Sequence, residues 1–448
     1  MLAALALAGA QGAGQASRAE DDTWAQIEEV LSGVTAIYYT PPDVDGMLRG
    51  ALVAMVQQVP RADFDASSHR ERYRIRVGRQ TVASLPHPTE LDEVMVGILK
   101  AADALHGATR VPRERLVESA LRGAVQGMGN CYTVYLTRDM VQRLSYEPDQ
   151  TPADVGIALE CGQEGMVRHV RPGSPAYVGG IERGDRVRSV DGKPCRGMDA
   201  AEIYALLSGP CGSRTRVGVT RRSGVDLTVD LMREERPAAR PWVRELAQGK
   251  VLYVRPGPMT AHTTQELAPH LACDRRQGVV LDLRGNEGGR VDEAENFAGL
   301  FLEPGPVAHL EGRGQRDLGH LVVKAAGPCS HVPLVVLVDH DTASAAELIA
   351  QALRERRGAA LLGQTTFGKG SVQQFLRFSD GAVAKVTTAR YLSPSGKPLD
   401  HPLDPDVVLS DSGVALGPTS DPMVDPLVRL ASERLLVLGP GAPTAQGK

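Results

Sequence analysis

Lysine is scarce in this sequence, and its scarcity makes the position of each one informative. The chain has 448 residues and 50 lysines and arginines together, of which only eight are lysine. Arginine cannot act as a base near neutral pH, because its pKa stays above about 12. Acidic and basic residues nearly balance, giving a net charge of −4. Aromatic residues are also few, at 4% of the chain. These values exclude a strongly basic surface, so the sequence predicts no nucleic-acid partner.

Cysteine and long apolar runs are also in short supply. The six cysteines include no CxxC pair. That distribution excludes the usual zinc spacing and a dense disulfide framework, although it is compatible with one or two disulfides. No apolar run reaches the roughly 18 to 20 residues that a bilayer span requires.

The N-terminal segment, residues 1–17, contains a short apolar run and the small residues Ala8-Gly9-Ala10. This pattern resembles the end of a signal peptide, although the basic residues that usually precede the apolar run are missing. A disordered leader and a misplaced start codon are the alternatives. We expect export to the bacterial cell envelope, in the periplasm or outside the cell, with a cytoplasmic location as the alternative.

Two different patterns fill the first half of the chain. Residues 18–150 carry apolar residues three and four apart, which predicts a helical region. The string LRGA occurs twice there, at 48–51 and 121–124, which suggests an old duplication. Residues 151–236 instead contain short strand-like runs separated by glycine turns, with a short helix expected at Pro175 and a hairpin signal at Asp191-Gly192.

The second half has the alternating pattern of an α/β domain. Between residues 237 and 412, apolar strand-like runs alternate with amphipathic helices, which predicts a sheet with helical crossovers. The final segment, 413–448, contains an amphipathic helix over 421–438 followed by a polar tail. The expected fold class is therefore multidomain α/β (α+β).

The stretch DHDTASAAE, 339–347, follows a buried strand-like run and opens a helix that we expect to start near Thr342 or Ala343. The N–H groups at a helix start favour a nearby anion, so a serine there can attack a carbonyl whose oxyanion is then stabilised. Ser344 is the candidate nucleophile. Taken alone, the pattern is more typical of ordinary helix-capping residues than of a nucleophile.

Lys369 favours the interpretation of Ser344 as a nucleophile, because it is one of only eight lysines and lies between Gly368 and Gly370. A buried lysine can act as a general base if desolvation lowers its pKa from about 10.4 to about 7–8. The shift corresponds to roughly 3–5 kcal/mol. A surface turn is the alternative. A third motif, DLRGNEGG at 282–289, ends in two glycines whose backbone N–H groups could face an oxyanion.

Together these motifs resemble the C-terminal processing peptidases, or tail-specific proteases, of the S41 serine-protease class. The match runs from DLRGNEGG through TASAAE to FGKGSVQ, and continues in RYLSPSG. The glycine-turn unit at 151–236 resembles a PDZ domain in the position where that family has one. The resemblance implies a helical N-terminal region that includes part of the protease core (18–150), a PDZ domain and a crotonase/ClpP-like α/β serine-protease core.

The resemblance also implies roles for individual residues. It assigns a catalytic pair to Ser344 and Lys369, with Gln373 orienting the lysine and Glu347 in support. It assigns the oxyanion hole to the backbone N–H groups of Gly289 and Ala345. The peptide-binding loop of the PDZ domain would comprise Gly156, Ile157, Ala158 and Leu159.

The function implied is that of a serine endopeptidase that cleaves proteins at or near the C-terminus, with the PDZ domain holding the substrate tail. Its partners would be proteins or peptides with exposed C-termini, together with an activating or adaptor protein and a second copy of the chain. The chemistry needs no metal and no organic cofactor.

Three departures from the family pattern stand out: MGNCYTVYL, 128–136, replaces an LDPHS-like motif, the serine motif reads DHDTASAAE, and the region before about 110 is less typical. The sequence leaves three alternatives to a Ser-Lys peptidase: a Ser-His hydrolase using His340, a non-catalytic PDZ adaptor or chaperone on a protease scaffold, and an enoyl-hydratase-like enzyme. The complete set of Ser344, Lys369 and Gln373 favours the peptidase.

Overall fold

A computed structural model of the chain describes residues 13–65, 72–144, 153–171, 173–235, 241–408 and 421–438. Most of the predicted leader, 1–17, lies outside these residues. The chain forms two compact units. The first comprises Met1–Arg236 with Gln373–Thr387, and the second comprises Pro237–Val372 with Thr388–Lys448. No helix in the described ranges combines the length and apolar character needed to cross a bilayer.

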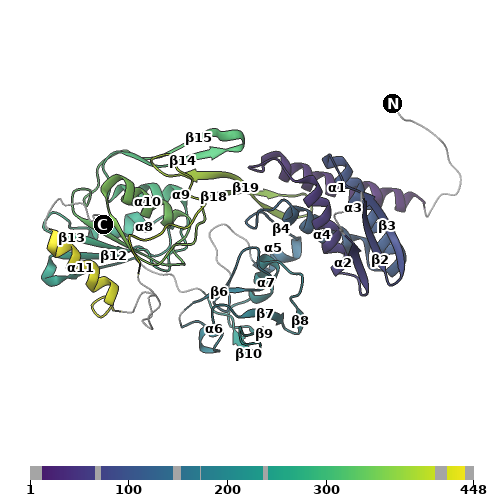
Figure 1. The fold of residues 1–448 in the computed structure, drawn as a ribbon, viewed down its shortest axis with the longest axis horizontal. Coiled ribbons are helices and arrows are strands. Elements are labelled where there is room, and N and C mark those ends of the chain that lie inside the picture. The colour runs from purple at the N-terminus through teal and green to yellow at the C-terminus, as the bar shows by residue number, and fades with distance from the viewer. Residues whose placement is uncertain are drawn as a thin grey trace. The chain divides into compact units, whose positions relative to one another are not determined.

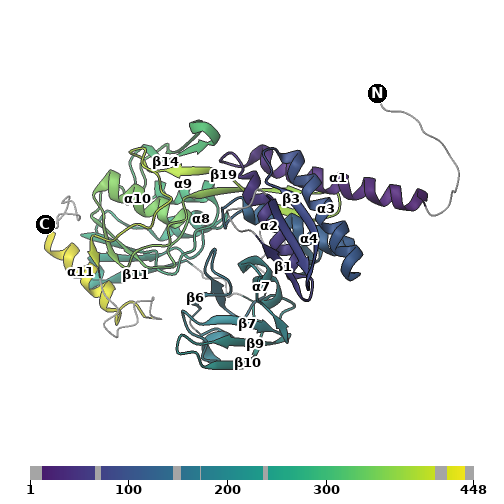
Figure 2. The ribbon, with the colours of Figure 1, turned by 45° about the vertical axis from the view of Figure 1, so that its right-hand side comes forward.

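The first unit begins with a helical region, as the apolar spacing predicted. Its helices are α1 (Ala13–Ile37), α2 (Val44–Gln57), α3 (Leu91–Thr109), α4 (Arg113–Gly127) and the short α5 (Arg138–Leu144). A three-stranded antiparallel sheet of β1 (Ala62–Asp65), β2 (Arg72–Val77) and β3 (Gln80–Pro86) accompanies them. The apolar faces of α1 to α4 and of the three strands share one core, and Figure 2 shows these elements together. The buried residues of α5 belong to a separate cluster.

The two LRGA strings meet in this region, because α2 and α4 pack against each other through glycine. A Cβ atom on Gly50 would lie 2.1 Å from the carbonyl oxygen of Gly123, and one on Gly127 would lie 2.1 Å from that of Gly46. Backbones this close leave no room for any side chain. The repeated motif therefore provides the surface through which the two helices pack.

The PDZ region of the first unit contains two small antiparallel sheets and two helices. One sheet has the order β10 (Asp226–Met232), β9 (Arg214–Thr220), β7 (Arg186–Val190) and β8 (Lys193–Pro194), and the other pairs β5 (Ile157–Leu159) with β6 (Val167–Val170). The helices are α6 (Pro175–Val178) and α7 (Ala200–Leu207). Asp191 and Gly192 have φ values of 51° and 76°, as the predicted hairpin turn requires.

Contacts between α4 and α7 hold the PDZ region against the helical region within this unit. Arg122 forms a 2.9 Å ion pair with Glu202, and both side chains are largely buried. A disulfide joins Cys131, after α4, to Cys161, after β5. A second disulfide, Cys273–Cys329, lies in the other unit. The sequence allowed one or two disulfides, and the structure contains two among its six cysteines.

The second unit is built on a six-stranded sheet in the order β11 (Trp242–Leu246), β12 (Val251–Arg255), β13 (Gly278–Asp282), β16 (Leu334–Val338), β17 (Ala360–Gly363) and β20 (Val407–Val408). All neighbouring pairs from β12 to β20 are parallel, and β11 is antiparallel to β12. The helical crossovers α8 (Thr263–Leu267), α9 (Val291–Gly299) and α10 (Ala345–Arg357) agree with the α/β pattern of the sequence.

Alternating residues of these strands face two separate cores. Val279, Leu281 and Val336 pack with α9 and α10, whereas Val280, Val335 and Leu337 pack with α11 (Pro426–Leu438). Figure 1 shows α9 and α10 on one side of the sheet and the yellow α11 on the other. Burial on both faces explains why the strands are continuous apolar runs.

A second sheet contains a hairpin that the sequence analysis did not predict, β14 (Gly305–Gly312) and β15 (Arg316–Val323). In the second unit, β14 pairs with the C-terminal end of β19 (Val383–Leu392). In the first unit, β4 (Val134–Leu136) pairs with the N-terminal end of β19. The chain thus leaves the second unit along β18 (Ser371–Arg377) and returns along β19.

Candidate active site

Ser344 lies at the turn between β16 and α10, with φ 55° and ψ −120°. A positive φ is rare outside glycine, and such backbone strain costs about 1–3 kcal/mol and is found preferentially at functional sites. The helix starts at Ala345, slightly later than the predicted Thr342 or Ala343, because Ser344 adopts this non-helical conformation. Ser344 is half-buried while its neighbours Ala343 and Ala345 are buried, so its side chain lies at the edge of a packed turn.

The carboxylate of Glu347 connects this turn to the GKG segment. Its Oε2 accepts the backbone N–H of Ser344 at 2.8 Å and that of Lys369 at 2.9 Å. Its Oε1 accepts the Thr366 hydroxyl at 2.6 Å and the Gly368 N–H at 2.7 Å. Burial raises the pKa of the Glu347 carboxyl, while these four hydrogen bonds act to lower it. One buried side chain therefore fixes the spacing of the backbone at both predicted catalytic residues.

The glycine pair at the end of the DLRGNEGG motif lies against the same turn. A Cβ atom on Gly288 would lie 2.7 Å from the Ala343 carbonyl oxygen, 2.7 Å from the Ala345 nitrogen and 3.1 Å from the Ser344 Cβ. Gly288 has φ +90°, and its N–H donates to the side-chain oxygen of Asn286 at 2.9 Å. Only glycine meets both the conformation and the close approach to Ser344.

Gly289 is exposed and its N–H takes no part in the local backbone pairing. Gly289 forms a parallel bridge with Met259, whose two hydrogen bonds use the Gly288 carbonyl and the Arg290 N–H. Ala345 is the first residue of α10, where an N–H has no partner within the helix. The two backbone donors predicted for an oxyanion hole thus flank the contact between Gly288 and the serine turn.

Asp339, at the end of β16, holds the serine turn to the loop after β13. Its Oδ1 accepts the N–H groups of Gly285 at 2.9 Å, Asp341 at 3.1 Å and Thr342 at 3.0 Å. Thr342 in turn donates its hydroxyl to the Leu283 carbonyl at 2.9 Å, and the Ala343 N–H donates to the Asn286 carbonyl at 2.9 Å. Burial raises the pKa of the Asp339 carboxyl.

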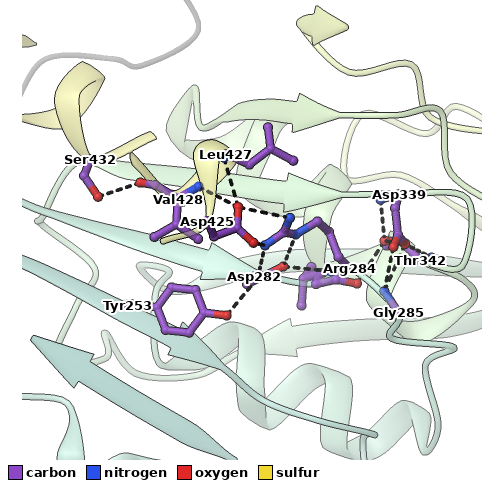
Figure 3. Close-up of polar contacts among 11 residues, drawn as sticks. Tyr253, Asp282, Arg284, Gly285, Asp339, Thr342, Asp425, Leu427, Val428 and Ser432 are labelled. Carbon is purple, nitrogen blue, oxygen red and sulfur yellow. Dashed lines mark hydrogen bonds and ion pairs between the residues drawn. The ribbon is translucent and has the colours of Figure 1, made fainter. Parts of the chain in front are cut away.

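Beneath this loop, Arg284 is 2% exposed and forms ion pairs with two carboxylates. It lies 2.7 Å from Asp282 Oδ2 and 2.8 Å from Asp425 Oδ2, and the Tyr253 hydroxyl donates to Asp282 at 2.8 Å. Figure 3 shows the guanidinium between the two carboxylates, with the Asp339 cluster beside it. The arginine of the DLRGNEGG motif is thus structural, linking the loop to the first turn of α11.

The remaining predicted residues lie in the first unit. Gln373 is half-buried in β18, and Ile157, Ala158 and Leu159 form β5, paired with β6. Gly156 has φ +85°, and a Cβ atom there would lie 2.2 Å from the Ser174 side chain. Its own N–H donates to Asp154 at 2.7 Å, so this amide is already engaged.

Sequence reasoning overlooked several residues that build the site. Asn286, Asp339, Thr342 and Thr366 all position its backbone. The first three lie within the DLRGNEGG and DHDTASAAE motifs, but no positioning role was predicted for any of the four. A polar residue at the carboxyl end of a buried strand was the available signal for Asp339. The strained φ of Ser344 had no signal, since serine does not mark such a position as glycine does.

Comparison with known proteins identifies two domain families in the chain. The Peptidase family S41 profile matches residues 250–409, and the PDZ domain profile matches residues 166–221. A solved structure named the photosystem II D1 C-terminal processing protease aligns with 74% of this chain and 87% of its own. Its TM-score is 0.60 and its sequence identity is 25%. The predicted α/β multidomain fold class is confirmed.

Three curated relatives are similar along most of the chain. The carboxyl-terminal-processing protease of Picosynechococcus is 31% identical over 298 residues, which cover 64% of this chain and 70% of that protein. Carboxy-terminal processing protease CtpA of Bacillus subtilis is 30% identical over 292 residues, covering 63% and 61%. The carboxy-terminal-processing protease of Bartonella bacilliformis is 28% identical over 308 residues, covering 66% and 70%.

The chain thus spans 61% to 70% of the length of these three relatives. The resemblance inferred from the DLRGNEGG, TASAAE and FGKGSVQ motifs is confirmed. The chain belongs to the carboxyl-terminal-processing proteases of peptidase family S41, a family of serine-type peptidases, and it carries a PDZ domain.

Proposed function

We propose that this protein is a serine endopeptidase with a Ser344–Lys369 catalytic pair, which cleaves proteins at or near their C-termini. The observation that carries the proposal is the shared acceptor: Glu347 Oε2 binds the backbone N–H of both residues. A buried carboxylate in that position holds two chain segments 25 residues apart at a fixed spacing.

In the proposed mechanism neutral Lys369 takes the proton of the Ser344 hydroxyl as Oγ attacks the peptide carbonyl. The resulting oxyanion receives hydrogen bonds from the N–H groups of Gly289 and Ala345. Lys369 then protonates the leaving amine, and water hydrolyses the acyl-enzyme. Gln373 orients the lysine in this scheme.

The PDZ domain supplies the preference for a substrate tail. An extended peptide would pair with β5, and its C-terminal carboxylate would meet the turn at Gly156–Ile157. The engaged N–H of Gly156 leaves those of Ile157 and the following residues as the donors to be tested. An activating or adaptor protein and self-association remain predictions from the family resemblance.

The decisive experiment compares wild type, Ser344→Ala and Lys369→Ala on an unstructured protein with an apolar C-terminal tail, with cleavage followed by mass spectrometry. Cleavage by wild type alone supports the catalytic pair. His340→Ala serves as the control, and it should retain most of the activity because the Ser-His alternative would depend on it. Near-normal cleavage by Lys369→Ala would contradict the mechanism.

The same substrate with an amidated C-terminus tests the PDZ assignment separately. Slower cleavage of the amidated form, with an unchanged rate on a tail-free peptide, supports carboxylate recognition. If wild type and Ser344→Ala both bind the tail and neither cleaves, the protein is a PDZ binding protein on a protease scaffold.

We also propose that the protein acts in an oxidising compartment such as the periplasm. Two disulfides support this location, because disulfides persist outside the reducing cytosol. Alkylation of free thiols in cells lysed under denaturing conditions, followed by mass spectrometry, should label only Cys195, which is buried in the folded protein, and Cys211. Labelling of all six cysteines would contradict it.

A further inference from the structure

Two histidines face each other across the β14–β15 hairpin, outside the proposed peptidase site. His309 and His320 are register partners on the two antiparallel strands. Their Nδ1 atoms are 2.7 Å apart, and their rings are nearly perpendicular, with centroids separated by 4.8 Å. Each ring is at least partly exposed, so solvent ions can reach the pair.

The outer nitrogen of each ring faces an oxygen acceptor. His309 Nε2 lies 3.2 Å from the Pro394 carbonyl oxygen, and His320 Nε2 lies 3.5 Å from Asp317 Oδ2. A carbonyl or carboxylate acceptor favours the tautomer with its proton on Nε2. In two neutral rings of that tautomer, neither Nδ1 atom can donate a hydrogen bond to the other. At 2.7 Å the two Nδ1 atoms therefore either share a proton or ligate one cation that takes its place.

We propose that His309 and His320 form a binding site for a late first-row divalent metal ion, with Cu²⁺ preferred. Metal-binding histidines commonly donate their other N–H to a carboxylate or a backbone carbonyl, as both rings are placed to do here. Imidazole nitrogen suits Cu²⁺, Ni²⁺ and Zn²⁺, and affinity for a given site is greatest for Cu²⁺.

The spacing of the two nitrogens favours a square-planar ion over a tetrahedral one. With metal–nitrogen distances of about 2.0–2.1 Å, adjacent ligands of a square-planar ion are about 2.9 Å apart and those of a tetrahedral ion about 3.3 Å. The observed 2.7 Å needs only a small opening of the pair to receive Cu²⁺. Two protein ligands leave the other coordination positions to water.

The test is a calorimetric titration of the full, metal-stripped chain with CuCl₂, comparing wild type with His309→Asn, His320→Asn and the double variant. We expect each single variant to lose the same single equivalent of Cu²⁺, and the double variant to lose no more, because both rings serve one ion. In each single variant the remaining ring should bind Cu²⁺ at least about tenfold more weakly, which removes that equivalent from the tight-binding phase of the titration.

His401→Asn is the matched control, since that histidine is 83% exposed on its side chain and lies apart from the pair in sequence. It should leave the titration unchanged. Asp317→Asn adds a second readout. Loss of a carboxylate that positions the His320 ring should lower the affinity for Cu²⁺ about tenfold and leave the number of sites unchanged. If wild type and His309→Asn bind Cu²⁺ identically, or if His401→Asn loses as much as either pair variant, the site does not exist.

Discussion

The backbone N–H of Lys369 donates a 2.9 Å hydrogen bond to Oε2 of Glu347, the oxygen that also accepts the N–H of Ser344. Both bonds use the backbone, not the side chain, of a proposed catalytic residue. Glu347 therefore acts as a positioning residue, which sets the distance between the head of α10 and the GKG segment. Its four donors occupy both carboxylate oxygens, so its charge and its shape matter together.

Glu347→Gln should uncouple the two segments, because an amide nitrogen would face two backbone donors in place of one carboxylate oxygen. We expect kcat/KM to fall about 100-fold, the usual cost of a small misplacement of reacting groups. The free energy of unfolding should fall by about 1–3 kcal/mol, since buried donors lose their acceptor. Peptide cleavage and chemical denaturation measure the two effects. Glu433→Gln, at an exposed position, is the control and should change neither.

Gly288→Ala should disrupt the proposed oxyanion hole. The added methyl group would lie 2.7 Å from the Ala343 oxygen and the Ala345 nitrogen, forcing the serine turn to move. Loss of one oxyanion donor typically lowers kcat about 100- to 1000-fold, and we expect a loss of that size.

Gly285→Ala is a matched control for this variant, because Gly285 also has a positive φ, 67°, but no atom lies within 4 Å of its added Cβ. It should lose stability through backbone strain and keep most of its activity. Equal losses of kcat in the two variants would show that strain, and not contact with Ser344, governs the effect.

The contribution of Asp339 to the free energy of unfolding should fall as pH rises above 3.8, the ordinary pKa of an aspartate side chain. Burial raises the pKa of Asp339 in the folded protein above its ordinary value of 3.8. Between these two pKa values the folded state binds more protons than the unfolded state, so this group lowers the free energy of unfolding as pH increases.

Asp339→Asn removes the titration and keeps an oxygen that can accept the three N–H groups now bound to Oδ1. The stability of wild type relative to this variant should therefore be greatest near pH 4 and should decline toward neutral pH. Thermal unfolding of both proteins across that range measures the difference. A difference that is constant with pH, or that grows as pH rises, would contradict the assignment.

Breaking the Cys131–Cys161 disulfide should loosen the PDZ region from the helical region of the first unit. The bond joins the segment after α4 to the end of β5, and it encloses a loop with a sequence separation of 30. Disulfides of this kind stabilise by about 2–4 kcal/mol. The variant with both Cys131→Ser and Cys161→Ser should show faster amide exchange in β5 and α7.

The ion pair of Arg122 with Glu202 remains in that variant, so the PDZ region should stay folded. Cys211→Ser replaces an exposed free cysteine and should leave amide exchange unchanged. Unchanged exchange in the double variant would show that the noncovalent contacts alone fix the PDZ region.

The sequence alone was enough to predict the α/β multidomain fold class and the family to which the chain belongs. Apolar spacing distinguished the helical region from the α/β unit, because helices and strands repeat their buried faces with different periods. The glycine-flanked Lys369 stood out because lysine is rare in this chain. The hairpin of β14 and β15 was missed because its strands are partly exposed and carry few apolar residues.

Only the tertiary structure decided how these segments meet. Ser344 adopts a strained positive φ, and Gly288 packs against it, through contacts that join residues more than 50 positions apart. The four donors of Glu347 and the pairing of His309 with His320 likewise depend on where separate segments come together. Local sequence patterns determine the elements, because they depend on neighbours along the chain. The positions of donors and acceptors depend on packing between distant segments, which no local pattern records.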